Sequence, residues 1–310
     1  MPGIADDIKR HFQEGDALTR LILVQIAVYV VYLLLNIAST LFQVRIAESV
    51  VEFVALPSDL FKLATRPWTL FTYMFLHQGF FHIFFNLLWL YFGGRLFMDY
   101  FGGRRLWSVF LIGGLIGGLL YVVFYNVFPA FENAVASSNN RGASAGVMAL
   151  IIAIATYNPR FPVKLFFVVT VPLWGIAVGF VLLDLIGLGD GQNAGGRIAH
   201  LGGAAFGYFM AQQYRQGNDL TEGFSALMDQ VVGAVRGFFV PEAKLKTVHR
   251  SKQARGQRNG RSSSSGRSSS SSKAYTQRDM DAILDKISKS GYDSLSKEEK
   301  DTLFKIGKDQ

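Results

Sequence analysis

The sequence contains no cysteine and few charged residues. Without cysteine the chain can form no disulfide, no thiolate metal site and no cysteine nucleophile. Charged residues make up 17% of the chain, against about 25% in typical soluble domains. Apolar residues make up 50%, and most lie in long blocks between Leu21 and Tyr214. This composition excludes an ordinary soluble globule and a disordered chain.

Six apolar blocks are candidates for membrane spans. A transmembrane helix needs about 20 predominantly apolar residues, and helices are expected because lipid offers no partner for free backbone groups. The sequence therefore predicts an all-α membrane protein with a bundle of six transmembrane helices. The expected helices are about 21–38, 70–98, 106–128, 142–157, 163–188 and 197–214. The second segment is longer than a span needs and is expected to start with an interfacial turn.

Lysine and arginine are unevenly distributed among the short loops. The loop between the third and fourth predicted helices and that between the fifth and sixth carry one arginine each. The loops on the other side carry more basic residues, namely Arg95, Arg104, Arg105, Arg160 and Lys164. The positive-inside rule then places both termini in the cytoplasm, and we expect a multi-pass protein of a bacterial inner membrane. The second, fourth and sixth helices begin at one depth near the outer face.

The chain divides into four parts by composition. Residues 1–20 form an N-terminal segment, which is too acidic for a transit peptide, and 21–215 form the membrane domain. Residues 216–275 are a basic juxtamembrane segment with a Ser/Gly-rich linker at 256–273, expected to face anionic lipid. The linker region shows no aromatic interleaving typical of nucleic-acid binding.

Residues 276–310 are expected to form a small soluble helical module. Thr276 with Asp279 and Ser296 with Glu299 have the spacing of capping boxes, with Gly291 in the turn between two short helices. The apolar core available to these helices is small. The module is therefore predicted to be a docking unit, whose partner the sequence does not specify, rather than an enzyme.

Four polar residues fall at one level near the outer face of the predicted bundle. Ser144 follows Arg141 by three residues and His200 follows Arg197 by three, which is roughly 5 Å at 1.5 Å per residue. His82 lies near the start of the second helix, and Asn86 lies on the same face one turn deeper. Ionisable groups at membrane depth are costly and usually functional.

Small residues surround the serine and the histidine. Gly142 precedes Ser144, while Gly203 and Gly207 follow His200 at the spacing that lets helices approach closely. A Ser144–His200 hydrogen bond then becomes reachable, and neutral histidine can take the serine proton. The free N–H groups at the start of the fourth helix, with His82 and Asn86, could stabilise an oxyanion.

Each of these residues also has an ordinary interpretation. A serine in a membrane helix commonly bonds a backbone carbonyl and packs against a neighbour. His82 and Asn86 could form a polar clamp between helices, and His77 is interpreted as interfacial. Asp184 could be a third member of a catalytic group, but an anion reaching to the interface is the favoured interpretation. The common depth of Ser144 and its partners favours a site.

Three segments resemble the rhomboid intramembrane serine proteases. They are Trp68–Gly94 (WTLFTYMFLHQGFFHIFFNLLWLYFGG), Gly142–Leu150 (GASAGVMAL) and Ala199–Gly207 (AHLGGAAFG). The resemblance covers about Leu21–Tyr214 and implies a six-helix membrane domain that cleaves single-pass membrane proteins in or beside their transmembrane segment. It implies no cofactor and no metal, with Ser144 as nucleophile, His200 as base, and His82 and Asn86 at the oxyanion.

The sequence departs from the family pattern in three places. Ala145 stands where a glycine often follows the serine, and Met148 where a tyrosine often stacks on the base histidine. The family's Trp-Arg pair is replaced by Trp68-Thr69, with Arg66 on the other side of Pro67. Alanine also permits close packing, so activity is expected to survive the first change. Met148 bears on how His200 is oriented, and the Trp68-Thr69 pair bears on the local contacts of its loop.

Other functions remain as alternatives. The chain could be a catalytically inactive rhomboid-like protein that binds membrane clients. Gly187–Asp190 reads as GxGD, a motif of intramembrane aspartyl proteases, but that mechanism needs a second aspartate at the same depth. The third alternative is a transporter. The polar residues of a transporter should line a path across the bilayer, whereas those of this chain gather at one depth.

Overall fold

The computed structural model describes residues 10, 12–165, 168–189, 193–239, 283, 285–287 and 294–306. The chain forms two compact units, Met1–Ala243 and Lys244–Gln310. The first unit contains all the apolar blocks, and the second contains the predicted C-terminal module. Each unit is described by itself.

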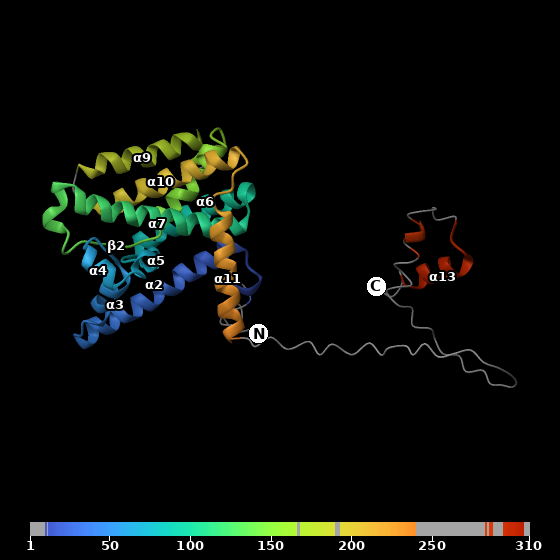
Figure 1. Cartoon of the computed structure of the whole chain (residues 1–310), viewed down its shortest axis with the longest axis horizontal. Coiled ribbons are helices and arrows are strands. Elements are labelled where there is room, and N and C mark those ends of the chain that lie inside the picture. The colour runs from blue at the N-terminus through green and yellow to red at the C-terminus, as the bar shows by residue number, and fades with distance from the viewer. Residues whose placement is uncertain are drawn as a thin grey trace, which may run out of the picture. The chain divides into compact units, whose positions relative to one another are not determined.

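The first unit is a bundle of helices suited to a membrane. Three helices are long and apolar enough to span one: α2 (Ala17–Phe42), α6 (Phe80–Phe101) and α7 (Gly103–Val127). α8 (Ser144–Tyr157) and α9 (Leu173–Leu188) are shorter apolar helices, and α10 (Ala194–Arg215) is rich in glycine and alanine. α7, α9 and α10 run side by side in Figure 1. The predicted all-α membrane bundle is confirmed.

The turn expected at the start of one predicted helix is confirmed, and the predicted start of another helix is wrong. The block expected at 70–98 is divided into α5 (Thr69–Thr72), the 3₁₀ turn η1 (Tyr73–Phe75) and α6, with Gly79 at φ +91° capping α6. The block expected at 163–188 begins with an antiparallel hairpin of β3 (Pro162–Leu165) and β4 (Val169–Pro172). Proline cannot donate a helical hydrogen bond, so α9 starts only after Pro172.

A long connection with short elements of its own joins α2 to α6. It contains α3 (Ile46–Val54), the two-residue strand β1 (Leu56–Pro57) and α4 (Leu60–Thr65). β1 pairs with β2 (Asn139–Asn140), which follows the 3₁₀ helix η2 (Pro129–Ala134). Because β2 leads into α8, this pairing fixes the chain just before Ser144.

Glycine lets the backbones of α7, α8 and α10 approach closely. A Cβ atom at Gly203 would overlap the carbonyl oxygen of Ala145, and one at Gly207 would overlap that of Ala149. From the other side, a Cβ at Gly117 would overlap the carbonyl oxygen of Ala199. The three helices therefore form the centre of the bundle, and α8 is buried along most of its length.

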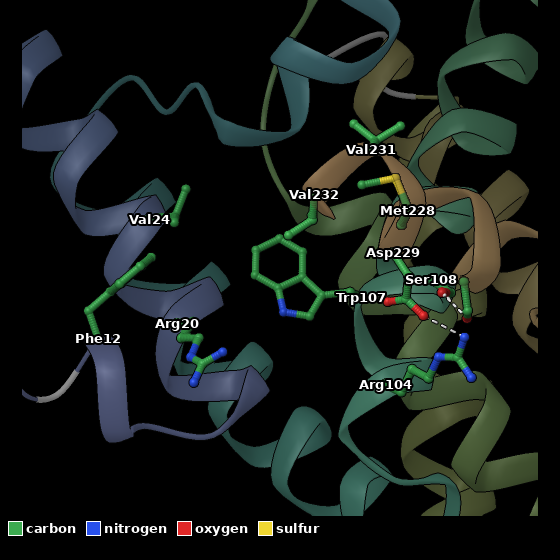
Figure 2. Close-up of a pocket in the computed structure, with 11 residues that line it drawn as sticks. Phe12, Arg20, Val24, Arg104, Trp107, Ser108, Met228, Asp229, Val231 and Val232 are labelled. Carbon is green, nitrogen blue, oxygen red and sulfur yellow. Dashed lines mark hydrogen bonds and ion pairs between the residues drawn. The ribbon is translucent and has the colours of Figure 1, made fainter. Parts of the chain in front are cut away.

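The helix α11 (Glu222–Phe239) runs across the end of α7 and is not among the elements that the sequence predicts (Figure 1). Its Ser225 hydroxyl lies 2.7 Å from that of Ser108, and Asp229 accepts a 2.6 Å hydrogen bond from Arg104. A cavity of about 780 Å³ lies between α2, α7 and α11. Figure 2 shows the Trp107 indole projecting into it, with Arg20 on the α2 side.

The turn between α10 and α11 is held by Asp219. Its carboxylate accepts hydrogen bonds from Arg105 Nε at 2.7 Å and from the Thr221 N–H at 2.9 Å. Burial raises the pKa of the Asp219 carboxyl, but the hydrogen bonds from Thr221 and the pairing with Arg105 outweigh it and lower that pKa below its usual value.

In the second unit, α13 (Lys297–Ile306) begins with the predicted capping box. The Ser296 N–H donates to Glu299 Oε2 at 2.7 Å, and the Glu299 N–H donates to Ser296 Oγ at 3.3 Å. This prediction is confirmed. The other predicted capping box, at Thr276 and Asp279, and the linker 256–273 lie outside the described residues.

Replacing Gly203 by Val should separate α10 from α8. The new side chain would meet the backbone of Ala145, which cannot move aside as a side-chain end can, so we expect a destabilisation of about 1–3 kcal/mol or more. Thermal unfolding of the purified protein in detergent measures this. Gly179→Val on α9 is the matched control, because a Cβ there has nothing within 4 Å. Equal melting temperatures of the two variants would contradict the close packing.

Candidate active site

Ser144 is the first residue of α8, and Gly142 sets its position. The Gly142 backbone has φ +121°, and its N–H donates to the Tyr73 carbonyl at 2.9 Å. A Cβ on Gly142 would lie 2.7 Å from His82 Nε2. Glycine is therefore required here both for its backbone conformation and for the close approach of His82. The role expected for Gly142, close packing at the site, agrees with this geometry.

The structure brings Ser144 and His200 together. His200 lies in the first half of α10, and its Nε2 is 2.6 Å from Ser144 Oγ. The backbone contact of Gly203 with Ala145, one turn further along α10, makes this distance reachable. A hydroxyl bonded to an unprotonated imidazole nitrogen is the arrangement of an activated serine nucleophile.

Asp184 lies on the other side of the His200 ring. Its two carboxylate oxygens are 3.0 and 3.1 Å from His200 Nδ1. The residue is only 7% exposed, although the rest of α9 faces outward over much of its length. The interpretation of Asp184 as an anion reaching to the interface is therefore wrong, because burial and a histidine partner hold it in the bundle.

His82 and Asn86 lie on the face of α6 that is turned toward the serine. Asn86 is buried, and its Nδ2 donates to the His82 carbonyl at 2.8 Å. An amide carries two N–H donors, so one remains for another acceptor. Among the described residues, Asn86 Oδ1 is buried without a hydrogen-bond partner.

His77 is fully buried and is not interfacial, so that interpretation is wrong. Its Nε2 accepts a 3.4 Å hydrogen bond from the Ala143 N–H, and its ring contacts that of His82 with centroids 4.9 Å apart. His77 therefore supports both the segment before Ser144 and the ring of His82. His77 lies in the loop between η1 and α6, so no helical periodicity in the sequence marks it as a buried residue.

These side chains line one cavity of about 330 Å³. Ser144, His200, His82, Asn86 and Asp184 all contribute to it. Its apolar wall consists of residues that, apart from Met148, the sequence analysis did not select, although the α6 members repeat on the face of His82 at three- and four-residue intervals. They are Phe85 and Trp89 from α6, Val147, Met148 and Ile151 from α8, and Phe180 and Leu183 from α9.

The three departures from the family pattern have structural counterparts. Ala145 is buried, with its Cβ facing Gly117 of α7, and Met148 lines the cavity. Trp68 Nε1 donates to the Phe53 carbonyl at 2.9 Å, and Arg66 Nη1 donates to the Glu52 carbonyl at 2.6 Å. The tryptophan and the arginine on either side of Pro67 thus both bind the backbone of α3.

The described parts of the chain contain no group of three or more His, Asp or Glu side chains arranged to hold a metal ion. Asp190, the aspartate of the GxGD sequence, lies outside the described residues. The polar groups that line the described cavity are a hydroxyl, two imidazoles, two amides, a carboxylate and the guanidinium of Arg141.

Comparisons with known proteins agree with this architecture. The rhomboid domain family matches residues 64–216, and a family of unknown function (DUF6576) matches residues 269–308. RHOMBOID-like protein 12, mitochondrial, from Arabidopsis thaliana is 29% identical over 167 residues, which are 51% of this chain and 49% of that protein. Inactive RHOMBOID-like protein 8 from the same plant is 32% identical over 91 residues, 29% of this chain and 24% of that protein.

The chain thus spans about half the length of the first of these curated relatives and about a quarter of the second. The matched domain contains every residue that lines the cavity, and it lies on a bundle with membrane-spanning helices. The chain is therefore an integral membrane protein that belongs to the rhomboid family.

Proposed function

We propose that the protein is an intramembrane serine endopeptidase that cuts membrane proteins in or beside a transmembrane segment. The observation that carries the proposal is the 2.6 Å contact between Ser144 Oγ and His200 Nε2, inside a cavity at the ends of α8 and α10. A serine hydroxyl becomes a useful nucleophile only when a base takes its proton, and His200 is placed to do so.

The first chemical step transfers the Ser144 proton to His200 Nε2. As the proton leaves, Ser144 Oγ bonds to the carbonyl carbon of the scissile peptide, and the C=O π pair moves onto the carbonyl oxygen. The tetrahedral intermediate then collapses, the C–N bond breaks, and the His200 proton goes to the leaving nitrogen. An acyl group remains on Ser144, and the amine product departs.

The negative carbonyl oxygen needs hydrogen-bond donors aimed at it. The first N–H groups of α8 have no partner within their own helix, and the positive end of the helix dipole lies at the same place. His82 and the second N–H of Asn86 can add side-chain donors from α6. Donors fixed before the reaction stabilise the oxyanion without reorganisation.

Water completes the cycle. A water molecule gives a proton to His200 Nε2 and attacks the acyl carbon, and the ester bond to Ser144 breaks as Oγ takes the proton back. The products are a carboxylic acid and the free serine. Ser144 is the first residue of α8, and we expect water to reach it from the outer face of the membrane at this end of the helix.

A transmembrane substrate has to enter from the lipid and expose a carbonyl to Ser144. α6 and α9 both contribute to the apolar wall of the cavity, and Trp89 of α6 meets Phe180 of α9 edge-on at 4.7 Å between ring centroids. We propose that the substrate segment enters between these two helices. A helical backbone hides its carbonyls, so segments that unwind easily should be cut preferentially.

The membrane of residence is also a proposal. The distribution of Lys and Arg supports cytoplasmic termini, and we propose a bacterial inner membrane. The relative named RHOMBOID-like protein 12 is described as mitochondrial. We further propose that residues 276–310 are a docking module attached by the linker to the membrane domain.

A second candidate function is binding of membrane clients without cleavage. The observation that favours it is the similarity to a protein named Inactive RHOMBOID-like protein 8. Here, however, the serine and the histidine are both present and within hydrogen-bond distance. Cleavage is therefore the better-supported function.

Removing either member of the pair should abolish cleavage. We expect the wild type to cut a model single-pass substrate in proteoliposomes, and Ser144→Ala and His200→Ala to lose activity by at least about 10³-fold. Labelling by a fluorophosphonate probe measures the serine directly and should disappear in Ser144→Ala. A wild type that neither cuts nor labels would leave client binding as the function.

Gly142→Ala should inactivate the site without removing any catalytic group. The added methyl would meet His82 Nε2 and would occupy a backbone conformation at φ +121° that favours glycine. We expect probe labelling to fall strongly, while membrane insertion is retained. Gly223→Ala on α11, where a Cβ has nothing within 4 Å, is the control; full labelling of Gly142→Ala would contradict the proposed geometry.

Asn86→Ala should slow catalysis more than it weakens substrate binding. Loss of one oxyanion donor typically costs about 10²–10³ in kcat, and Asn86 contributes such a donor only if its second N–H reaches the intermediate. Kinetics with the model substrate separate kcat from KM. An unchanged kcat would assign Asn86 to helix packing.

A further inference from the structure

We propose that Asp184 on α9 is a positioning residue for His200, so that the site operates with a serine, a histidine and a carboxylate rather than with a dyad. This inference rests on the proposed function. The resemblance to rhomboid proteases implies a dyad without a carboxylate, so the third group is a property of this chain.

The carboxylate is placed where a positioning group has to be. Its oxygens lie 3.0 and 3.1 Å from His200 Nδ1, while Nε2 of the same ring is 2.6 Å from Ser144 Oγ. Hydrogen-bond partners on opposite edges of the ring, an acceptor at Nδ1 and a donor at Nε2, fix both its rotation and its place. Asp184 is 7% exposed, so water competes little for its oxygens.

Asp184 also selects the tautomer of His200. A neutral imidazole carries one proton, on either nitrogen. A carboxylate beside Nδ1 favours the proton there, which leaves the Nε2 lone pair facing the serine hydroxyl. When Nε2 takes the serine proton, the resulting imidazolium lies beside an anion. Asp184 itself takes up no proton in this step.

The carboxylate has a second neighbour that holds it independently of His200. Arg197 Nη1 lies 3.9 Å from Asp184 Oδ1 and donates a 2.8 Å hydrogen bond to the Leu183 carbonyl. Its guanidinium lies directly over Gly187, where any Cβ would overlap it. Arg197 on α10 therefore binds the turn of α9 that carries Asp184. Its positive charge offsets part of the free-energy cost of burying a carboxylate in a membrane helix.

The position of His200 is thereby linked to the position of α9. Within the described residues of α9, only Leu173, Ala177, Asp184 and Gly187 are buried. A second cavity, of about 580 Å³, lies between α8, α9 and α10 behind this helix. α9 is thus held at few points, and a shift of this helix away from α10 would withdraw the carboxylate from Nδ1.

A purely structural role is the competing explanation, because Asp184 also ties α9 to α10. The two roles predict different kinetics. A structural tie affects folding and substrate binding, whereas a positioning residue affects the reactivity of Ser144. A small irreversible probe reports that reactivity without needing a transmembrane substrate.

The experiment compares Asp184→Asn with Asp184→Glu and wild type in full-length protein in detergent and in proteoliposomes. We expect Asp184→Asn to lower both the fluorophosphonate labelling rate and kcat by roughly 10²-fold or more, with KM little changed. Asp184→Glu keeps the charge and should recover a measurable part of the rate. Asp219→Asn makes the same chemical change at the other end of α10, in a carboxylate paired with Arg105, and should label like wild type.

A double variant tests whether Asp184 acts through His200. In the His200→Ala background, Asp184→Asn should cause no further loss of labelling, because the ring that it positions is gone. Wild-type labelling by Asp184→Asn, a loss confined to KM, or an additive loss in the double variant would overturn the inference while leaving the proposed function intact. If Asp184→Asn does not fold, a charge-retaining Asp184→Glu that labels no better than His200→Ala would likewise overturn it. A wild type that is neither labelled nor active would instead remove the proposed function.

Discussion

The site depends on the close approach of the α8 and α10 backbones. Gly203 and Gly207 of α10 lie against the carbonyls of Ala145 and Ala149, where no side chain fits. Van der Waals packing of this kind is the main force between helices in lipid, where the hydrophobic effect does not favour one helix pair over another. It brings the first turn of α8 and the first half of α10 close enough for Ser144 to bond His200.

Most of the buried polar groups in and beside the cavity have hydrogen-bond partners, which lowers the cost of burying them in a membrane protein. His77 binds the backbone before Ser144, Asn86 binds the backbone of α6, and Asp184 binds His200. Hydrogen bonds join the loop before α6 to the segment before α8, α8 to α10, and α9 to α10. The site therefore depends on several elements at once, and α9 has the fewest buried residues among α6, α8, α9 and α10. The reactivity of Ser144 therefore depends on the position of α9, through the side chains of His200 and Asp184.

Much of the site could be predicted from the sequence because depth in a membrane can be counted along the chain. Ser144 and His200 each follow an arginine by three residues, and the glycines after His200 indicated which helices would touch. The capping box at Ser296 is similarly local, since both partners lie within one helical turn. His77 and Asp184 were misinterpreted for a different reason. Their partners, Ala143 and His200, lie on other elements, and depth alone does not say toward which neighbour a side chain points.

The sequence by itself determined a chain of apolar helices with a hydroxyl and an imidazole at one level, because hydrophobicity, charge asymmetry and small-residue spacing are properties of single segments. Only the tertiary structure decided that α6 begins after a loop, that a hairpin precedes α9, and that α11 crosses the end of α7. It also decided that a carboxylate stands behind the histidine. The physical reason is that rotation of a helix about its axis and its register against its neighbours are set by packing between helices, which no single segment encodes.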